Sequence, residues 1–248
     1  MRVPYPHGQL VSGDTLLYSG HTERDAHYTE GVAFMLTPIA QKALIGWKLI
    51  SSRIISAKLT TKRKNINLHI VQCYAPTNDA EEEIKDGFYQ QLQAELDNKK
   101  TNDITILMGD FNARIGADNK CYEEIMGTHG IGQINVNGER FADLCALNQM
   151  VIGGSIFPHK NIHKVTWRSP DHTTENQIDH ICFVKRFRKS FQDVRVMRGA
   201  DVSSDHHMIM TTLKLKLKKY PATNAVRKRY NVQTLQNKDV QGKFQKMD

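Results

Sequence analysis

The chain has 248 residues, of which 40% are hydrophobic and 24% charged, as in globular proteins of one or two domains. Its apolar runs are too short to cross a bilayer and no apolar leader is visible, so neither a membrane protein nor a secreted one is expected. The formal net charge of +8 favours a polyanionic partner, although a basic surface without a ligand has the same charge.

The four cysteines are widely spaced and form no C-x-x-C pair. This spacing argues against a zinc site or a disulfide framework and favours a reducing, intracellular setting. Three of them lie in apolar stretches and are expected in the core, namely Cys73, Cys145 and Cys182.

The first half of the chain alternates between strands and a helix. Apolar alternation predicts strands over 14–18, 31–36, 54–59 and 66–74, with a short helix able to start at Thr37-Pro38. Asn78 or Asp79 is then expected to cap a longer helix. The buried stripe predicted for this helix consists of Ile84, Phe88, Leu92 and Leu96.

The second half repeats this mixture. A second helix is predicted after Asn137-Gly138, with Phe141, Leu144, Cys145 and Leu147 facing inward. Further strands are predicted over 103–108, 150–152, 165–167, 178–184, 194–197 and 208–213. Two helices among many strands predict an α/β sandwich, in a domain of residues 1–219 that is followed by a basic linker or tail over 220–248.

Polar residues follow two of these strands. Asp110 and Asn112 in Gly109-Asp110-Phe111-Asn112 come just after a buried strand, and their i, i+2 spacing points both side chains to one side of the sheet edge. Far downstream, Ser204-Asp205-His206 precedes another strand, and a carboxylate beside a histidine suits the activation of water. Together these segments predict hydrolysis of phosphate esters, whereas either alone is more typical of a turn or cap.

Four motifs appear in an order typical of one superfamily. They are Tyr74-Ala75-Pro76-Thr77, Gly109-Asp110-Phe111-Asn112, Gln177-Ile178-Asp179-His180 and Ser204-Asp205-His206. In this order the chain resembles the endonuclease/exonuclease/phosphatase superfamily, which has the DNase I-like fold of two mixed sheets flanked by helices. Residues 70–81, 165–170 and 198–207 look most like the endonuclease domain of RTE/BovB-type non-LTR retrotransposons, which nicks DNA to expose a 3′-hydroxyl primer. The resemblance runs from about residue 13 to residue 219.

The resemblance also reveals a difference at the start of the chain. Family domains open with a βαβ segment that carries a catalytic Asn and a metal-binding Glu, but residues 15–20 already match the family's third strand. Glu23 and Glu30 are nearby but are not assigned as a replacement ligand. Loss of a strand is expected to leave its neighbour with an unpaired edge, and loss of the Asn and Glu to weaken catalysis.

The resemblance implies a role for each candidate residue. Asp110 and Asn112 would position the attacking water and a phosphate oxygen, and Tyr74 would bind the scissile phosphate. Asp179 would hold His206, which is either a phosphate-contacting group or a general base. Asp205 and Asp110 would lie on the side of a Mg²⁺ or Mn²⁺ ion. Trp167 and Arg168 would flank a nucleic-acid groove, although Trp167 fits a place in the core equally well, and Asn176 has weaker support in shaping the site.

The function predicted from these residues is metal-dependent hydrolysis of DNA, with DNA as partner, no small-molecule cofactor and a nuclear location. Its activity is expected to be weak or absent because of the missing Asn and Glu. Two alternatives remain open from the sequence: a non-catalytic remnant that binds nucleic acid, and a phosphatase that acts on a small phosphate ester. The sequence predicts no oligomeric state.

Overall fold

The computed structural model describes residues 7–20, 30–199 and 204–216. Contacts divide the chain into one unit of Met1–Lys216 and another of Leu217–Asp248. The predicted boundary after residue 219, the basic tail and Glu23 all lie outside the described residues.

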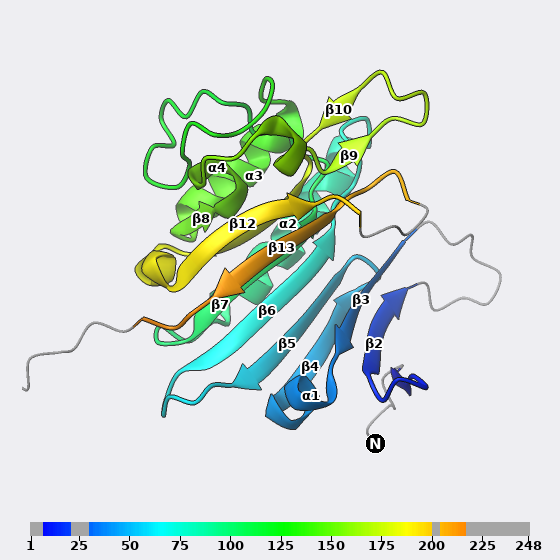
Figure 1. Cartoon of the computed structure of the whole chain (residues 1–248), viewed down its shortest axis with the longest axis vertical. Coiled ribbons are helices and arrows are strands. Elements are labelled where there is room, and N and C mark those ends of the chain that lie inside the picture. Colours follow the sequence, from blue (N-terminus) through cyan, green and yellow to red (C-terminus); the bar gives the residue numbers. More distant parts are fainter. Residues whose placement is uncertain (1–6, 21–29, 200–203, 217–248) are drawn as a thin grey trace, which may run out of the picture. The chain divides into compact units, whose positions relative to one another are not determined.

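The largest sheet has six strands in the order β4-β5-β6-β7-β11-β8 (Figure 1). Its members are β4 (Leu44–Ser51), β5 (Ile54–Thr60), β6 (Asn67–Tyr74), β7 (Ile104–Asp110), β11 (Asp179–Val184) and β8 (Met150–Ile152). Only β6 and β7 pair in parallel, and the other neighbours are antiparallel. β4 was not predicted from the sequence.

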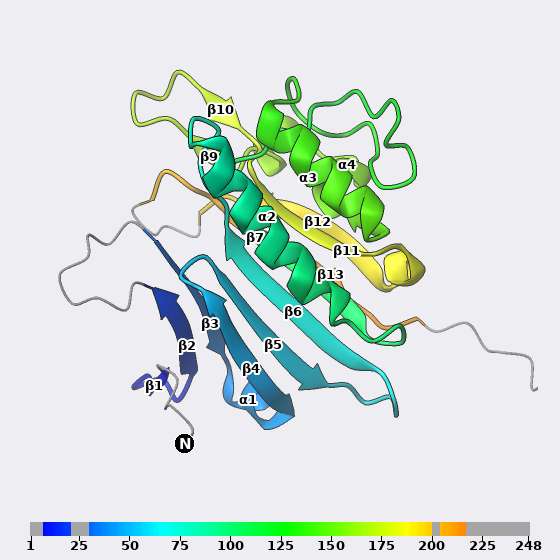
Figure 2. The same cartoon turned by 180° about the vertical axis from the view of Figure 1, so that it is seen from behind.

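Two helices cover one face of this sheet (Figure 2). They are α2 (Glu82–Asp97) and α3 (Val136–Leu147). Alternate strand residues, such as Val71, Cys73 and Leu107, join a core with apolar residues of both helices, and all three side chains are at most 1% exposed. Cys145 and Cys182 belong to the same core, so the predicted burial of these three cysteines is confirmed.

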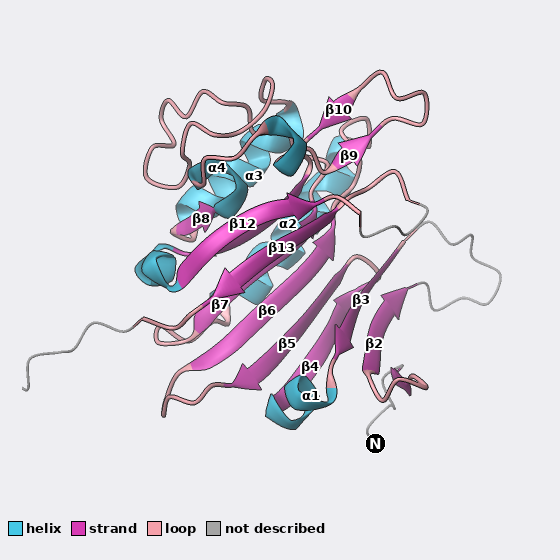
Figure 3. Ribbon diagram, viewed as in Figure 1, coloured by secondary structure: helices cyan, strands magenta, loops and turns pink. Residues whose placement is uncertain are grey.

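Two smaller sheets lie on the opposite face (Figures 1 and 3). One has the order β1-β2-β3 (His7–Gln9, Thr15–Gly20, Gly31–Leu36), and the other pairs β12 with β13 (Phe191–Met197, Met208–Leu213). Each packs apolar side chains on the large sheet. Among the described residues, β3 and β13 each pair on one side only.

The remaining elements are short. They are α1 (Pro38–Ala43), α4 (Gly153–Ile156), the 3₁₀ helices η1 (Asn161–His163) and η2 (Lys185–Ser190), and the hairpin of β9 (Trp167–Arg168) and β10 (Glu175–Asn176). None of the helices within the described ranges is both long and apolar enough to span a membrane.

Three local predictions were wrong. Glu81, rather than Asn78 or Asp79, precedes α2, because the Asn78 side chain accepts a hydrogen bond from the Asn137 amide of α3 instead. Ile84 and Leu147 are 51% and 73% exposed, since the buried faces of the two helices include their neighbours Lys85 and Asn148 instead. The strand predicted over 165–167 begins only at Trp167.

Candidate active site

Three predicted site residues form a row across adjacent strands. In the register of the large sheet, Asp110 at the end of β7 lies beside Tyr74 of β6 and beside Asp179 of β11. Because paired residues on neighbouring strands point to the same face, the sheet itself brings these three side chains together. The row lies on the face opposite α2 and α3.

The motif around Asp110 fits this position closely. Gly109 has φ +147°, and a Cβ atom there would lie 1.8 Å from the carbonyl oxygen of Cys73. A glycine is therefore required where β7 approaches β6. Phe111 is fully buried and packs against Phe141 with ring centroids 4.2 Å apart, which anchors the end of the strand in the core.

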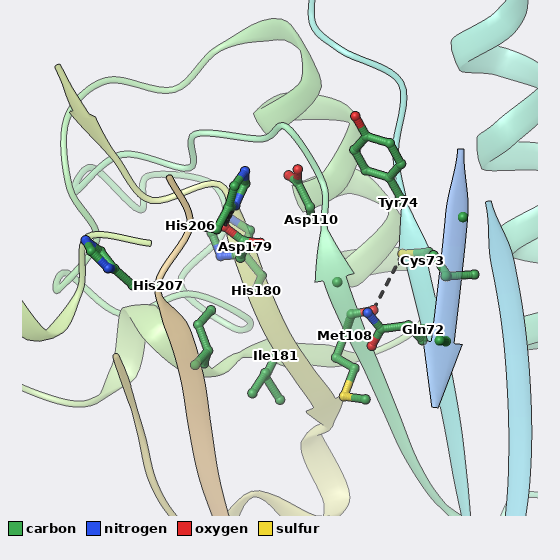
Figure 4. Close-up of a pocket in the computed structure, with 15 residues that line it drawn as sticks. Gln72, Cys73, Tyr74, Met108, Asp110, Asp179, His180, Ile181, His206 and His207 are labelled. Carbon is green, nitrogen blue, oxygen red and sulfur yellow. Dashed lines mark hydrogen bonds and ion pairs between the residues drawn. The ribbon is translucent and has the colours of Figure 1, made fainter. Parts of the chain in front are cut away.

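His206 reaches the row from the segment before β13. Its Nδ1 atom lies 3.0 Å from Oδ2 of Asp179, and Figure 4 shows its ring beside Asp179 and Asp110 while His207 points away. The hydrogen bond from His206 to Asp179 raises the pKa of the imidazole, against an opposing effect of burial. Asp179 therefore favours the protonated ring at neutral pH.

Asp110 is a carboxyl group whose charge is poorly compensated. Burial, together with the nearby negative charge of Asp179, raises its pKa to about 6. Ligand atoms of Asp110, Asp179 and His206 all lie within 4.8 Å of one another. Two carboxylates held this close are a donor set that fits a divalent cation, and such a cation would relieve the cost of ionising Asp110.

These residues line an open pocket of about 570 Å³. Its floor comes from the large sheet and includes Gln72 and Met108. One wall is the edge of β3 at 31–33, and the other is the start of β13. The pocket therefore lies between the two unpaired strand edges, with the Asp110 row among its lining residues.

Asn112 is close to this row but does not line the pocket. Its backbone, at φ +48°, turns the chain, and its amide N–H donates to Oδ1 of Asp110 at 2.8 Å. Its side-chain Nδ2 donates to the carbonyl of Ala75 at 3.0 Å. Asn112 thus ties the residue after Tyr74 to the segment after Asp110.

Asp205 and the predicted groove residues lie beside the pocket. The indole Nε1 of Trp167 donates to Oδ2 of Asp205 at 2.8 Å, and Asp205 lies outside the group formed by Asp110, Asp179 and His206. Arg168 and Asn176 belong to the β9-β10 hairpin. Arg168 is half exposed, and its guanidinium lies 3.7 Å from the carboxylate of Glu175.

Glu30 has other partners. Its carboxylate pairs with Arg53 at 2.8 Å and accepts a hydrogen bond from Ser52. These contacts agree with leaving Glu30 out of the predicted metal ligands.

Sequence reasoning missed Thr166. This residue is 1% exposed, and its hydroxyl accepts hydrogen bonds from the amides of Ile178 and Asp179 at 2.9 and 3.1 Å. The one available signal was a polar residue between the apolar Val165 and Trp167, and this pattern is too common to indicate a role.

Comparison with solved structures identifies the architecture. An AP endonuclease LMAP from Leishmania major aligns over 81% of this chain and 71% of its own, with 11% identity and a TM-score of 0.58. The endonuclease domain of TRAS1, a telomere-specific non-LTR retrotransposon, aligns over 82% of this chain and 81% of its own, with 13% identity and a TM-score of 0.54. The chain has the DNase I-like fold. The predicted fold class is therefore confirmed.

Other similarities agree with the DNase I-like fold. The 3′ phosphatase NExo from Neisseria, bound to a product DNA hairpin, matches over 82% of this chain and 79% of its own, with 16% identity and a TM-score of 0.56. The solved neighbours are thus nuclease and phosphatase proteins of the endonuclease/exonuclease/phosphatase type, as the resemblance predicted.

Curated sequences add a nearer relative. Craniofacial development protein 2 from Tragulus javanicus is 35% identical over 216 residues, which are 87% of this chain, and its Bos taurus counterpart is 34% identical over the same length. The chain spans only 37% and 36% of the length of these two relatives. No protein-family model matches the chain.

Proposed function

We propose that this DNase I-like chain hydrolyses phosphodiester bonds in DNA by nicking, with the help of Mg²⁺ or Mn²⁺. The observation that carries the proposal is the His206–Asp179 pair, which faces the half-buried Asp110 in an open pocket. A cationic imidazole and an acceptor for a water proton are the two protein groups that phosphodiester hydrolysis needs.

The comparisons and the charge support DNA as the substrate. Solved neighbours are named as endonucleases, and one is described as bound to a DNA hairpin. The formal net charge of +8 attracts a polyanion through release of its counterions. A nuclear location and a retrotransposon origin of the RTE type would follow from this function and belong to the same proposal.

The roles of the residues follow from their positions. Asp110, ionised above a pKa of about 6, accepts a proton from the attacking water, whose oxygen bonds to phosphorus as the bond to the leaving oxygen breaks. His206, whose protonated form Asp179 favours, binds a phosphoryl oxygen and stabilises its growing charge. Tyr74, beside Asp110 in the sheet, contacts the same phosphate from the other side.

Asp110, together with Asp179 or Asp205, would hold the metal ion, since Asp179 lies within 4.8 Å of Asp110 and the charge of Asp205 is near enough to raise the pKa of Asp110. A divalent cation bound there supplies charge neutralisation on the phosphoryl oxygens. One oxygen of Asp179 lies 3.0 Å from His206, and one oxygen of Asp205 accepts from the Trp167 indole at 2.8 Å, so neither carboxylate is fully available to the ion. With so few free carboxylates at the site, we expect metal binding to be weak and nicking to be slow.

The test is nicking of supercoiled plasmid with Mg²⁺ or Mn²⁺ and with EDTA. Nicking that needs metal and is lost in both Asp110→Ala and His206→Ala supports the proposal. Nicking that persists in both variants, or in EDTA, contradicts it and indicates a contaminating nuclease.

Two further outcomes separate the alternatives. Salt-sensitive DNA binding without any nicking would favour a remnant that only binds nucleic acid. Release of phosphate from a small ester that DNA does not compete with would favour a phosphatase.

A further inference from the structure

Thr166 connects three segments around the site through four hydrogen bonds. Its hydroxyl accepts from the amides of Ile178 and Asp179, at 2.9 and 3.1 Å. Its own amide donates to the carbonyl of Asn176 at 2.9 Å, and its carbonyl accepts from the amide of His207 at 2.7 Å. Thr166 is only 1% exposed, and its hydroxyl, amide and carbonyl all form hydrogen bonds with the backbone that carries the site.

The two residues that Thr166 brings together do not share a sheet. Asp179 begins β11 of the large sheet, and His206 precedes β13 of the two-stranded sheet. Their side chains meet at 3.0 Å only if both backbones are held in position. Thr166 bonds to Asp179 itself on one side and to the neighbour of His206 on the other.

The neighbouring residue strengthens this link. Trp167 forms an isolated antiparallel bridge with His206, and its indole holds Asp205 at 2.8 Å. The backbone from 166 to 168 therefore connects the two segments, and the Thr166 hydroxyl links it to Asp179 by accepting a hydrogen bond from the Asp179 amide.

We propose that Thr166 is a positioning residue for the Asp179–His206 pair. The hydroxyl sets the first residue of β11 so that the carboxylate of Asp179 meets Nδ1 of His206. Removal of the hydroxyl leaves two partly buried amides without their acceptor, and the start of β11 shifts to find others. The effect on the rate rests on the proposed function, whereas the effect on the pair does not.

The first measurement needs no DNA. Imidazole ¹⁵N chemical shifts of His206 are compared by NMR in wild type, Thr166→Val, Thr166→Ser and Asp179→Asn. Valine keeps the shape without an acceptor, whereas serine keeps the acceptor. We expect the His206 shifts of T166V to move toward those of D179N, and those of T166S to stay at the wild-type values.

The second measurement is nicking kinetics. Groups that orient a reacting residue typically contribute about ten- to a hundredfold, so T166V should lower kcat by about that factor while KM for plasmid stays within about twofold. T166S should restore kcat to within about threefold of wild type.

Ser155 provides the matched control. It is also fully buried, its hydroxyl also accepts a backbone hydrogen bond, from Gly127 at 3.1 Å, and it does not line the pocket. Ser155→Ala should lower the unfolding temperature, as T166V does, but leave the His206 shifts and kcat unchanged. If T166V does not fold, Thr166→Cys replaces it, since a thiol is a weak acceptor of similar size.

The outcomes are distinguishable. Wild-type shifts of His206 in a folded T166V or T166C variant would overturn the proposal, as would equal losses of kcat in T166V and S155A. A wild-type protein that does not nick would overturn the proposed function alone, because the NMR comparison still decides the role of Thr166.

Discussion

The two faces of the six-stranded sheet differ in how they are covered. On one face α2 and α3 bury every second residue of β6 and β7, such as Val71 and Leu107 at 0% exposure. On the other face the two small sheets cover the flanks, and Ile70 and Met108 between them remain half buried. The same strands thus supply stability through one face and an accessible row of polar residues through the other.

This difference shows how the fold can carry a strained, charged site. Burying Asp110 beside Asp179 is unfavourable, as the raised pKa of Asp110 shows. The apolar core on the helical side provides the stability that offsets this cost. Changes on the helical side should therefore alter stability, and changes on the open side should alter chemistry.

The largest effect on stability is expected at Gly109, where β7 closely approaches β6 within the sheet. Gly109→Ala would place a Cβ atom 1.8 Å from the Cys73 carbonyl, so β6 and β7 would have to separate. We expect a loss of more than about 4 kcal/mol in unfolding free energy, measured by urea denaturation. Gly87→Ala in α2 is the control, since its Cβ would meet nothing within 4 Å and alanine should stabilise the helix by up to about 1 kcal/mol. Equal stability of G109A and wild type would contradict the close approach of the strands.

The next effect compares the two faces directly. Leu92 of α2 is fully buried on the helical side, and Leu92→Ala should cost about 3 kcal/mol in unfolding free energy. Met108→Ala on the open side should cost only about 1 kcal/mol because Met108 is half buried. If the two variants were equally destabilised, something would cover the open face in solution.

Asp110→Asn should change the unfolding free energy by an intermediate amount, and it should stabilise the protein. A raised carboxyl pKa means that folding favours the neutral form, so the stability of the wild type falls as pH rises from about 4 to about 6. Removal of the charge should therefore stabilise the protein by about 1 to 3 kcal/mol at neutral pH while nicking is lost. Thermal unfolding across this pH range checks the prediction, and a flat difference between the two proteins would contradict it.

Metal binding can also be compared between the wild type and Asp110→Asn. Mg²⁺ or Mn²⁺ should raise the unfolding temperature of wild type at neutral pH, because the cation binds the folded state. The rise should be much smaller in Asp110→Asn, which lacks the carboxylate. An equal rise in both proteins would place the metal elsewhere.

The smallest effect on stability is expected for the His206–Asp179 pair. The hydrogen bond to Asp179 raises the pKa of His206, so its stabilising contribution is complete below the ordinary histidine pKa of about 6.5 and is lost as pH rises through the folded value. Asp179→Asn should lower the pKa of His206 in an NMR titration and remove this pH dependence. An unchanged pKa would mean that the carboxylate does not control the ring.

The sequence predicted the local parts of the site better than their connections. Asp110, Asp179 and His206 were found because each lies in a short motif at the end or start of a strand, and strand register then brings the first two together. Thr166 could not be found in this way, since its hydroxyl bonds to backbone amides 12 and 13 residues further along the chain. Asn78 failed as a helix cap for the same reason, because the Asn137 amide, 59 residues away, uses its side chain.

The fold shows a similar division. Alternation of apolar residues predicted most strands, and the order of the motifs predicted the DNase I-like architecture. Apolar spacing also placed Ile84 and Leu147 in the core, although both are exposed, because the buried faces of their helices carry the polar residues Lys85 and Asn148 at these points. The extent of contact between a helix and a sheet depends on tertiary packing, which a local sequence pattern does not show.

The most direct test of the central claim uses two histidine–aspartate pairs of the described residues. His159 lies 2.6 Å from Asp193 outside the pocket, whereas His206 lies 3.0 Å from Asp179 inside it. The measurement is the rate of metal-dependent plasmid nicking by wild type, His206→Ala and His159→Ala. Nicking that is lost in H206A and kept in H159A is the predicted result. Nicking that H206A retains at the wild-type rate would contradict a catalytic role for this pocket.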